Sequence, residues 1–287
     1  MTQQTITRTG FMGLLGGVAA ACTPLSAFNT LAPVDPAARA GRDIAYGPLP
    51  RQKLDIYAPA KAEKPAPVLV FFYGGGWVTG RRQDYAFAGK ALASRGFLTV
   101  VPDYRLVPEV RYPRFVEDGA LALRWVREHA AEYGGDPRRV VLAGHSAGAY
   151  IAVMLALDPA FATAAGADPA DIRAVAGLSG PYKFLPLRAP ATIAAFGGAP
   201  DLEATQPINH VHAGAPPALL LHGARDLAVS PKNSIRLAQA LQAVGATAEA
   251  KIYPGLGHPA MVLALSRPFR GKAPVLDDMT AFLMEHA

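Results

Sequence analysis

The chain has 287 residues, a formal net charge of +6 and 51% hydrophobic residues, a composition that supports one substantial buried core. Charged residues make up only 17%, and the basic ones are scattered in pairs such as Arg81-Arg82 and Arg138-Arg139. Nucleic-acid binding requires a clustered basic face, so this distribution argues against it.

The first 22 residues have the pattern of an export signal. A short polar stretch with Arg8 precedes an apolar run from Gly10 to Ala21, which is too short to span a bilayer by itself. The run 19–22, Ala-Ala-Ala-Cys, resembles a bacterial lipobox, and Cys22 is the only cysteine, which leaves no disulfide framework. We therefore expect an exported protein, either a cell-envelope lipoprotein attached to the membrane through Cys22 or a periplasmic protein released by ordinary signal cleavage. Residues 23–41 are expected to form a linker.

From residue 42 onward, strand-like and helix-like patterns alternate. This predicts one α/β domain, residues 42–287, with a mostly parallel sheet covered by helices on both faces. The stretch 181–215 is rich in Pro, Ala and Gly, and long irregular segments in compact domains are usually functional. Strands are predicted at 53–57, 68–72, 98–102, 140–143, 172–178, 218–222 and 246–253, and helices at 115–133, 147–157, 233–244 and 273–286, with a loop at 134–137.

Three consecutive glycines, residues 74–76, follow the strand at 68–72 directly. Glycines let backbone amides approach a ligand closely. Amides of this loop, together with the amide of Ala147, are candidates to bind the oxyanion of a tetrahedral intermediate, whereas a plain turn is the alternative. Trp77 beside the loop and Tyr150 further along are candidate substrate-binding residues, although core packing would equally account for both.

Residues 144–148, Gly-His-Ser-Ala-Gly, lie between the strand at 140–143 and the helix at 147–157. The G-x-S-x-G pattern is typical of a sharp strand-to-helix turn that exposes a nucleophilic serine, here Ser146. The alternative is an ordinary serine that caps the first helical turn.

Two further residues follow in the order acid, then histidine. Asp226 comes after the strand at 218–222, at the carboxyl end where open α/β sheets carry functional groups. His258 follows the last strand on the glycine-rich loop 254–257. Such a histidine accepts the serine proton while the carboxylate orients the ring, which predicts a serine hydrolase without metal or organic cofactor.

Other polar residues are given structural roles. Asp103 and Asp118 lie in a run that resembles a structural signature in which an Asp fixes loops beneath the site, so we expect a structural role for both. His222 ends an apolar strand, where a hydrogen-bonded core histidine is the usual case. His210 and His212 are spaced as a metal pair, but no carboxylate or cysteine partner joins them, so no metal is expected.

With these motifs, the chain resembles the α/β-hydrolase superfamily over roughly residues 42–286. Within it, the resemblance is to the carboxylesterase branch shared by hormone-sensitive-lipase-like esterases, small bacterial esterases and kynurenine-formamidase-like enzymes. The motifs that carry it are the glycines 74–76, the run 103–109 with Pro113 and Asp118, the pentapeptide 144–148, Asp226 and His258. The position of the stretch 181–215 resembles that of the lid insertion in this superfamily, which implies a short cap over a fairly open site.

The resemblance implies a role for each matching residue. It makes Ser146 the nucleophile, Asp226 the acid and His258 the base. The oxyanion donors that it implies are the amides of Gly75, Gly76 and Ala147. One departure is Tyr73, which stands where the family usually carries a histidine that braces the glycine loop. Another is His145, which differs from the Asp of many hormone-sensitive-lipase relatives and resembles the formamidase and small-esterase side.

The sequence thus predicts a carboxylesterase that acts on small or short-chain esters through a covalent acyl-enzyme. An amide hydrolase of formamidase type would use the same residues. A non-catalytic envelope lipoprotein that keeps the fold is the alternative from another class, and the joint presence of Ser146, Asp226 and His258 argues against it. The pattern selects neither the acyl nor the alcohol group, nor an oligomeric state.

Overall fold

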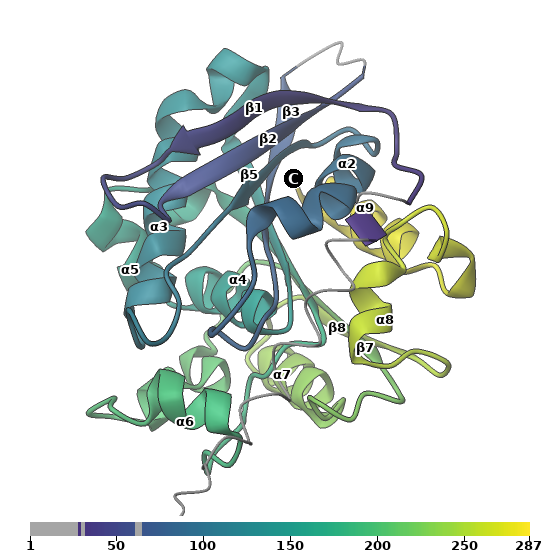
Figure 1. Ribbon diagram of the computed structural model, residues 1–287. Coiled ribbons are helices and arrows are strands. Elements are labelled where there is room, and N and C mark those ends of the chain that lie inside the picture. Colours follow the sequence, from purple (N-terminus) through teal and green to yellow (C-terminus); the bar gives the residue numbers. More distant parts are fainter. Residues whose placement is uncertain (1–27, 30–31, 61–64) are drawn as a thin grey trace, which may run out of the picture.

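The computed structural model describes residues 28–29, 32–60 and 65–287, so the predicted export signal and Cys22 lie outside the described residues. An eight-stranded sheet runs through the molecule in the order β1-β2-β4-β3-β5-β6-β7-β8 (Figure 1). The β1–β2 and β2–β4 pairs are antiparallel, and the remaining pairs are parallel. The predicted α/β class with a mostly parallel sheet is confirmed.

Seven of the eight strands of this sheet overlap strands predicted from the sequence, and the first has no predicted counterpart. The strands are β1 (Ala37–Ala45), β2 (Lys53–Pro59), β3 (Ala66–Phe72), β4 (Leu98–Pro102), β5 (Gly135–His145), β6 (Ile172–Leu178), β7 (Ala218–Gly223) and β8 (Ala248–Tyr253). The α-helices are α2 (Ala86–Ala93), α3 (Arg114–His129), α4 (Ala147–Leu157), α5 (Pro159–Ala165), α6 (Pro190–Phe196), α7 (Lys232–Ala243), α8 (His258–Leu263) and α9 (Val275–His286).

Helices cover the sheet in two layers. On one side α2 contacts α9, and on the other α3 packs on α4 and α5 (Figure 1). Strand β3 is buried at every residue, as expected for a strand covered on both faces. Helix α4 is also buried at every position, because small Ala and Gly side chains let it lie directly on β5 and β6. The serine that precedes α4 is therefore held by a rigid part of the core.

Two sequence predictions about boundaries are wrong. The sheet begins with β1 at Ala37, inside the predicted linker 23–41. Most β1 residues are exposed and Ala-rich, so this edge strand gives no hydrophobic alternation to find. The predicted loop at 134–137 belongs largely to β5, since Gly135 and Asp136 pair with Ala66 and Pro67 of β3.

Between β6 and β7, the stretch 181–215 contains only α6 and two short 3₁₀ helices, Glu203–Thr205 and Pro207–His210. One backbone hydrogen bond, from Tyr112 N to Ala195 O, joins this segment to the chain before α3, and another, from Ile208 N to Tyr182 O, closes within the segment. Tyr182 and Phe196 are fully buried, so residues 181–215, which we call the cap, pack against the core.

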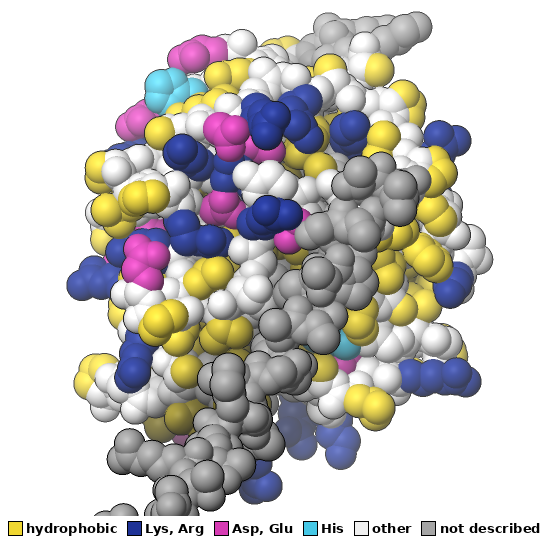
Figure 2. Space-filling view, in the orientation of Figure 1, with side chains coloured by type: hydrophobic (Ala, Val, Ile, Leu, Met, Phe, Trp, Pro, Cys, Tyr) yellow, Lys and Arg dark blue, Asp and Glu magenta, His cyan; other side chains and the backbone are white. Residues whose placement is uncertain are grey.

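Charges on the face shown in Figure 2 are mixed, with Lys and Arg side chains interspersed with Asp and Glu. Within the described ranges, no single helix has the length and apolar composition to cross a bilayer, and only α4 and α5 taken together, bent by 84° at their junction, meet that test.

Candidate active site

Ser146 lies at the sharp turn between β5 and α4, with a φ of 56° and a ψ of −120°. The turn depends on its two glycines. A Cβ on Gly144 would lie 2.3 Å from the carbonyl oxygen of Gly148, and a Cβ on Gly148 would lie 2.1 Å from that of Phe72. Both approaches are to backbone, which cannot move aside cheaply, so the sequence pattern at 144 and 148 follows directly from the close packing of α4 on β3.

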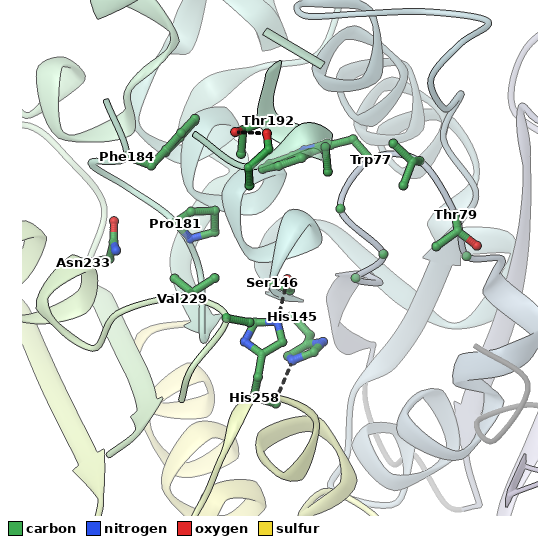
Figure 3. Close-up of a pocket in the computed structure, with 18 of the residues that line it drawn as sticks. Trp77, Thr79, His145, Ser146, Pro181, Phe184, Thr192, Val229, Asn233 and His258 are labelled. Atoms are coloured by element: carbon green, nitrogen blue, oxygen red, sulfur yellow. Dashed lines mark hydrogen bonds between the residues drawn. The ribbon is translucent and has the colours of Figure 1, made fainter. Parts of the chain in front are cut away.

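The structure brings Ser146, His258 and Asp226 together from three separate segments. His258 Nε2 lies 2.8 Å from Ser146 Oγ (Figure 3), and His258 Nδ1 lies 2.7 Å from Asp226 Oδ2. The carboxylate can only accept, so Nδ1 carries the proton and Nε2 is free to accept the serine hydroxyl. The side chain of Asp226 is fully buried, and that of His258 is 17% exposed. This geometry lets a proton pass from Ser146 to His258 during attack on a carbonyl.

Asp226 is held as an anion by several donors. Its Oδ1 accepts the amides of Ala228 and Val229, both at 2.9 Å. Burial opposes the charged form, but hydrogen bonds from His222, His258 and the amide of Val229 outweigh it and hold the pKa of Asp226 below its usual range. The acid is thus ionised at neutral pH.

His145, inside the turn, contacts the backbone of His258. Its Nε2 lies 3.0 Å from the backbone carbonyl oxygen of His258, to which it donates (Figure 3). Burial, followed by the nearby His258, lowers the pKa of His145 to about 3. His145 is therefore neutral at physiological pH and anchors the loop that carries His258.

The glycine loop, residues 74–76, lies close to Ser146. Gly75 and Gly76 have φ values of 142° and 61°, which L side chains rarely adopt. A Cβ on Gly74 would lie 3.1 Å from Cβ of Ser146, so the loop backbone approaches the turn closely. Among the described residues, the amides of Gly75, Gly76 and Ala147 have no hydrogen-bond partner, which leaves them available as donors to an oxyanion.

Tyr73 is part of a brace beneath this loop. Its ring stacks on Tyr104 at 4.6 Å, and its hydroxyl accepts a hydrogen bond of 2.8 Å from Arg51 Nη2. The same nitrogen donates to the carbonyl of Gly80 at 2.8 Å, and burial raises the pKa of Tyr73 well above its usual value. The phenol is therefore protonated and joins both ends of the loop 73–80 to Arg51.

A cavity of about 750 Å³ opens above Ser146. Trp77 lines it together with Phe184 and Thr192 of the cap, and Val229 and Asn233 form the opposite wall (Figure 3).

Trp77 and Tyr150, the two predicted substrate-binding residues, are placed differently. Trp77 borders the cavity with a φ of 62°. Tyr150 is fully buried behind it, with ring centroids 5.4 Å apart, and donates its hydroxyl to the carbonyl of Thr205. Of the two, only Trp77 belongs to the cavity wall, and Tyr150 fastens the cap to α4.

The carboxylates predicted to be structural are found in buried ion pairs. Arg82 Nε lies 2.9 Å from Asp55 and its guanidinium also contacts Asp103. Asp118 accepts from Arg105 Nη2 and from Gln52, both at 2.8 Å. In the part of the chain that the structure describes, no cluster of His, Cys, Asp or Glu has the geometry of a metal site.

Sequence reasoning missed two residues that matter here. Arg51 and Arg82 are scattered basic residues in sequence, yet Arg51 braces the glycine loop and Arg82 is 3% exposed among carboxylates. No local pattern distinguishes a buried arginine from a solvated one, since their partners Asp55, Tyr73 and Asp103 are distant in the chain.

Comparisons with known proteins agree with this fold and with the esterase class. Esterase 2 of Thermogutta terrifontis has a TM-score of 0.71 at 25% identity, covering 86% of this chain and 94% of that one. A carbohydrate esterase from gut microbiota shares the fold, with a TM-score of 0.75 at 22% identity over 88% of this chain and 96% of that one. The fold and the site define an α/β-hydrolase of the carboxylesterase branch.

The family follows from sequence. A family model described as BD-FAE matches residues 54–241, and the chain belongs to that family. It is similar to a probable isoprenylcysteine alpha-carbonyl methylesterase of Arabidopsis thaliana, at 32% identity over 80% of this chain and 52% of that protein. It is also similar to esterase LipC of Mycobacterium tuberculosis, at 32% identity over 76% of this chain and 59% of that protein. The chain thus spans between half and two thirds of the length of these curated relatives.

Proposed function

We propose that this chain is a serine carboxylesterase that hydrolyses small or short-chain carboxylic esters. The observation that carries the proposal is the hydrogen-bonded series Asp226, His258 and Ser146. Its Ser146 end faces an open cavity. The esterase names of its relatives support the same reaction class.

The chemistry follows from the positions of these groups. Ser146 Oγ attacks the ester carbonyl while His258 Nε2 takes its proton, and the amides of Gly75, Gly76 and Ala147 stabilise the oxyanion. His258 then gives the proton to the departing alkoxide, which leaves an acyl-serine. Water, deprotonated by His258, attacks this acyl group and releases the acid.

The test is hydrolysis of p-nitrophenyl esters from acetate to palmitate by the wild-type chain and by Ser146→Ala. We expect a wild-type maximum at short chains and a loss of at least about a thousandfold in kcat for the variant, because the nucleophile is removed while packing is kept. Its thermal unfolding should match that of the wild type. Activity that survives in Ser146→Ala would refute the assignment, and turnover of formamides alone would favour an amide hydrolase.

The cavity supports a second candidate substrate, a methyl ester of a larger acid. A volume of about 750 Å³ exceeds what an acetyl or butyryl group fills, and relatives are named isoprenylcysteine alpha-carbonyl methylesterases. Methyl esters with bulky apolar acyl groups, assayed beside methyl butyrate, distinguish the candidates. A preference for the bulky ester favours this second reading, and a preference for butyrate favours the first.

We also propose, from the sequence pattern alone, that the chain is exported and attached to a membrane through a lipidated Cys22. Cys22→Ala should then move the protein from the membrane fraction to the soluble fraction of the expressing bacterium without changing its activity. A variant that stays in the membrane fraction would count against lipidation.

A further inference from the structure

A second histidine lies on the other side of the acid. His222, near the end of β7, is fully buried, and its Nε2 lies 3.2 Å from Asp226 Oδ2. The same nitrogen lies 2.9 Å from the carbonyl oxygen of Val229, while Nδ1 lies 2.8 Å from the hydroxyl of Ser234 on α7. The oxygen that holds His258 is therefore shared by two imidazoles.

The neighbours of His222 decide where its hydrogens are. A carboxylate and a carbonyl can only accept, so Nε2 must carry a hydrogen. Ser234 is also fully buried, and Nδ1 of His222 is the one partner that the described residues offer to its hydroxyl. The hydroxyl donates to Nδ1, which fixes the ring as the Nε2–H tautomer.

The result is a nearly symmetric arrangement around one carboxylate. Ser146 donates to His258, which donates to Asp226 Oδ2. From the other side Ser234 donates to His222, which shares its Nε2–H between Asp226 Oδ2 and the carbonyl of Val229. Only the first arm reaches the cavity, because His222 and Ser234 are fully buried and neither lines it.

We propose that His222, oriented by Ser234, is a positioning residue that fixes Asp226 Oδ2 so that His258 faces Ser146 correctly. The inference rests on the proposed esterase function, since it assigns a role to the acid of that same site.

The physical reason lies in how the carboxylate is held. The amides of Ala228 and Val229 hold Oδ1, but the catalytic contact is made by Oδ2, where His258 is the group to be positioned. His222 is the donor at Oδ2 that does not move with the His258 ring, so it holds this oxygen independently of His258. Hydrogen bonds to an ionised group are short and directional, so the position of Oδ2 determines the tilt of the His258 ring. A tilt that moves Nε2 by about 1 Å can cost roughly a hundredfold in rate.

The predicted loss belongs to kcat, because His222 touches neither the cavity nor a bound ester. We expect His222→Leu to lower kcat for p-nitrophenyl butyrate by at least about tenfold while KM stays within about twofold. His222→Gln places an amide N–H close to the position of Nε2, so it should recover kcat to within about threefold of the wild type.

Two further variants keep the test decisive. Ser234→Ala removes the tautomer-fixing hydroxyl from a small buried site, and we expect about a threefold loss in kcat even if His222→Leu fails to fold. His210→Leu is the matched control, because His210 Nε2 donates to the carbonyl of Ala204 at 2.8 Å in the cap and touches none of these groups. Its kcat should stay within about twofold of the wild type.

The outcomes separate the two proposals. If the wild type is inactive on every ester, the proposed function fails. If the wild type is active and His222→Leu is as fast, the inference alone fails. Equal losses in His222→Leu and His222→Gln, or a loss in KM with kcat unchanged, would also overturn it, because neither fits a role carried by the N–H at Oδ2.

Discussion

At the scale of single residues, Tyr73 shows how one site accommodates a departure from the pattern of its relatives. The usual histidine braces the glycine loop, and here a phenol does so with the help of Arg51 and the stacked ring of Tyr104. Tyr104 adds a hydrogen bond from its own hydroxyl to the carbonyl of Tyr73 at 2.9 Å. The loop is thus held by side chains that sequence comparison at position 73 alone would not suggest.

Removing this hydroxyl should weaken the loop without dismantling it. Tyr73→Phe removes a hydrogen bond in which Arg51 is the charged partner, a change of about 2 kcal/mol in the free energy of unfolding. Arg51 keeps its bonds to the carbonyls of Gly80 and Tyr104. Because two of the proposed oxyanion donors, Gly75 and Gly76, belong to this loop, we also expect kcat to fall by about three- to tenfold. Urea unfolding and steady-state kinetics measure the two effects.

A matched control separates the loss of stability from the loss of kcat. Tyr253→Phe removes a hydroxyl that lies 2.7 Å from Asp278 of α9, so it should lower stability by a similar amount and leave kcat unchanged. If both variants lose kcat equally, the effect of Tyr73 is one of general stability rather than of loop geometry.

At the scale of secondary-structure elements, the site is assembled from the carboxyl ends of parallel strands. The glycine loop follows β3, Ser146 follows β5 and Asp226 follows β7, while His258 begins α8 after β8. Strands β3, β5 and β7 were predictable because each contains a run of apolar residues, which a parallel strand covered on both faces requires. The residues at their ends could therefore be expected to meet before any distance was known.

Other elements could not be predicted for equally physical reasons. Strand β1 is an exposed edge without alternation. The cap depends on distant partners, since Asn233 of α7 accepts the amides of Tyr182 and Lys183 through Oδ1, each at 2.8 Å. His222 was interpreted as a core histidine, which its burial supports. Its contact with Asp226 depends on the turn that follows β7, and its contact with Ser234 depends on the packing of α7.

At the scale of the whole molecule, the buried ionisable groups of the site lower the stability of the fold in acid. The folded-state pKa of His145 is about 3, whereas an unfolded histidine has a pKa of about 6.5. Between these values the unfolded chain binds a proton that the folded chain does not, so stability falls as the pH drops through this window. Asp226 has a depressed pKa, so its contribution is lost in a lower window, below the unfolded value of about 3.9.

Replacing His145 with glutamine should remove the loss of stability that His145 causes in acid and leave the loss that Asp226 causes. The glutamine amide can donate to the carbonyl of His258 in place of Nε2, but it binds no proton. The wild type should lose on the order of 3 kcal/mol of its unfolding free energy through His145 between neutral pH and pH 4. His145→Gln should give a flatter stability curve over that interval. It should still be destabilised below pH 4, where the unfolded chain binds a proton at Asp226 and the folded chain does not. Urea unfolding at half-unit pH steps measures both curves.

His129→Gln, at the partly exposed end of α3, is the control, and its stability curve should follow that of the wild type. If His145→Gln and the wild type lost stability in parallel from pH 6.5 to 4, a buried neutral His145 could not be the cause of the acid sensitivity.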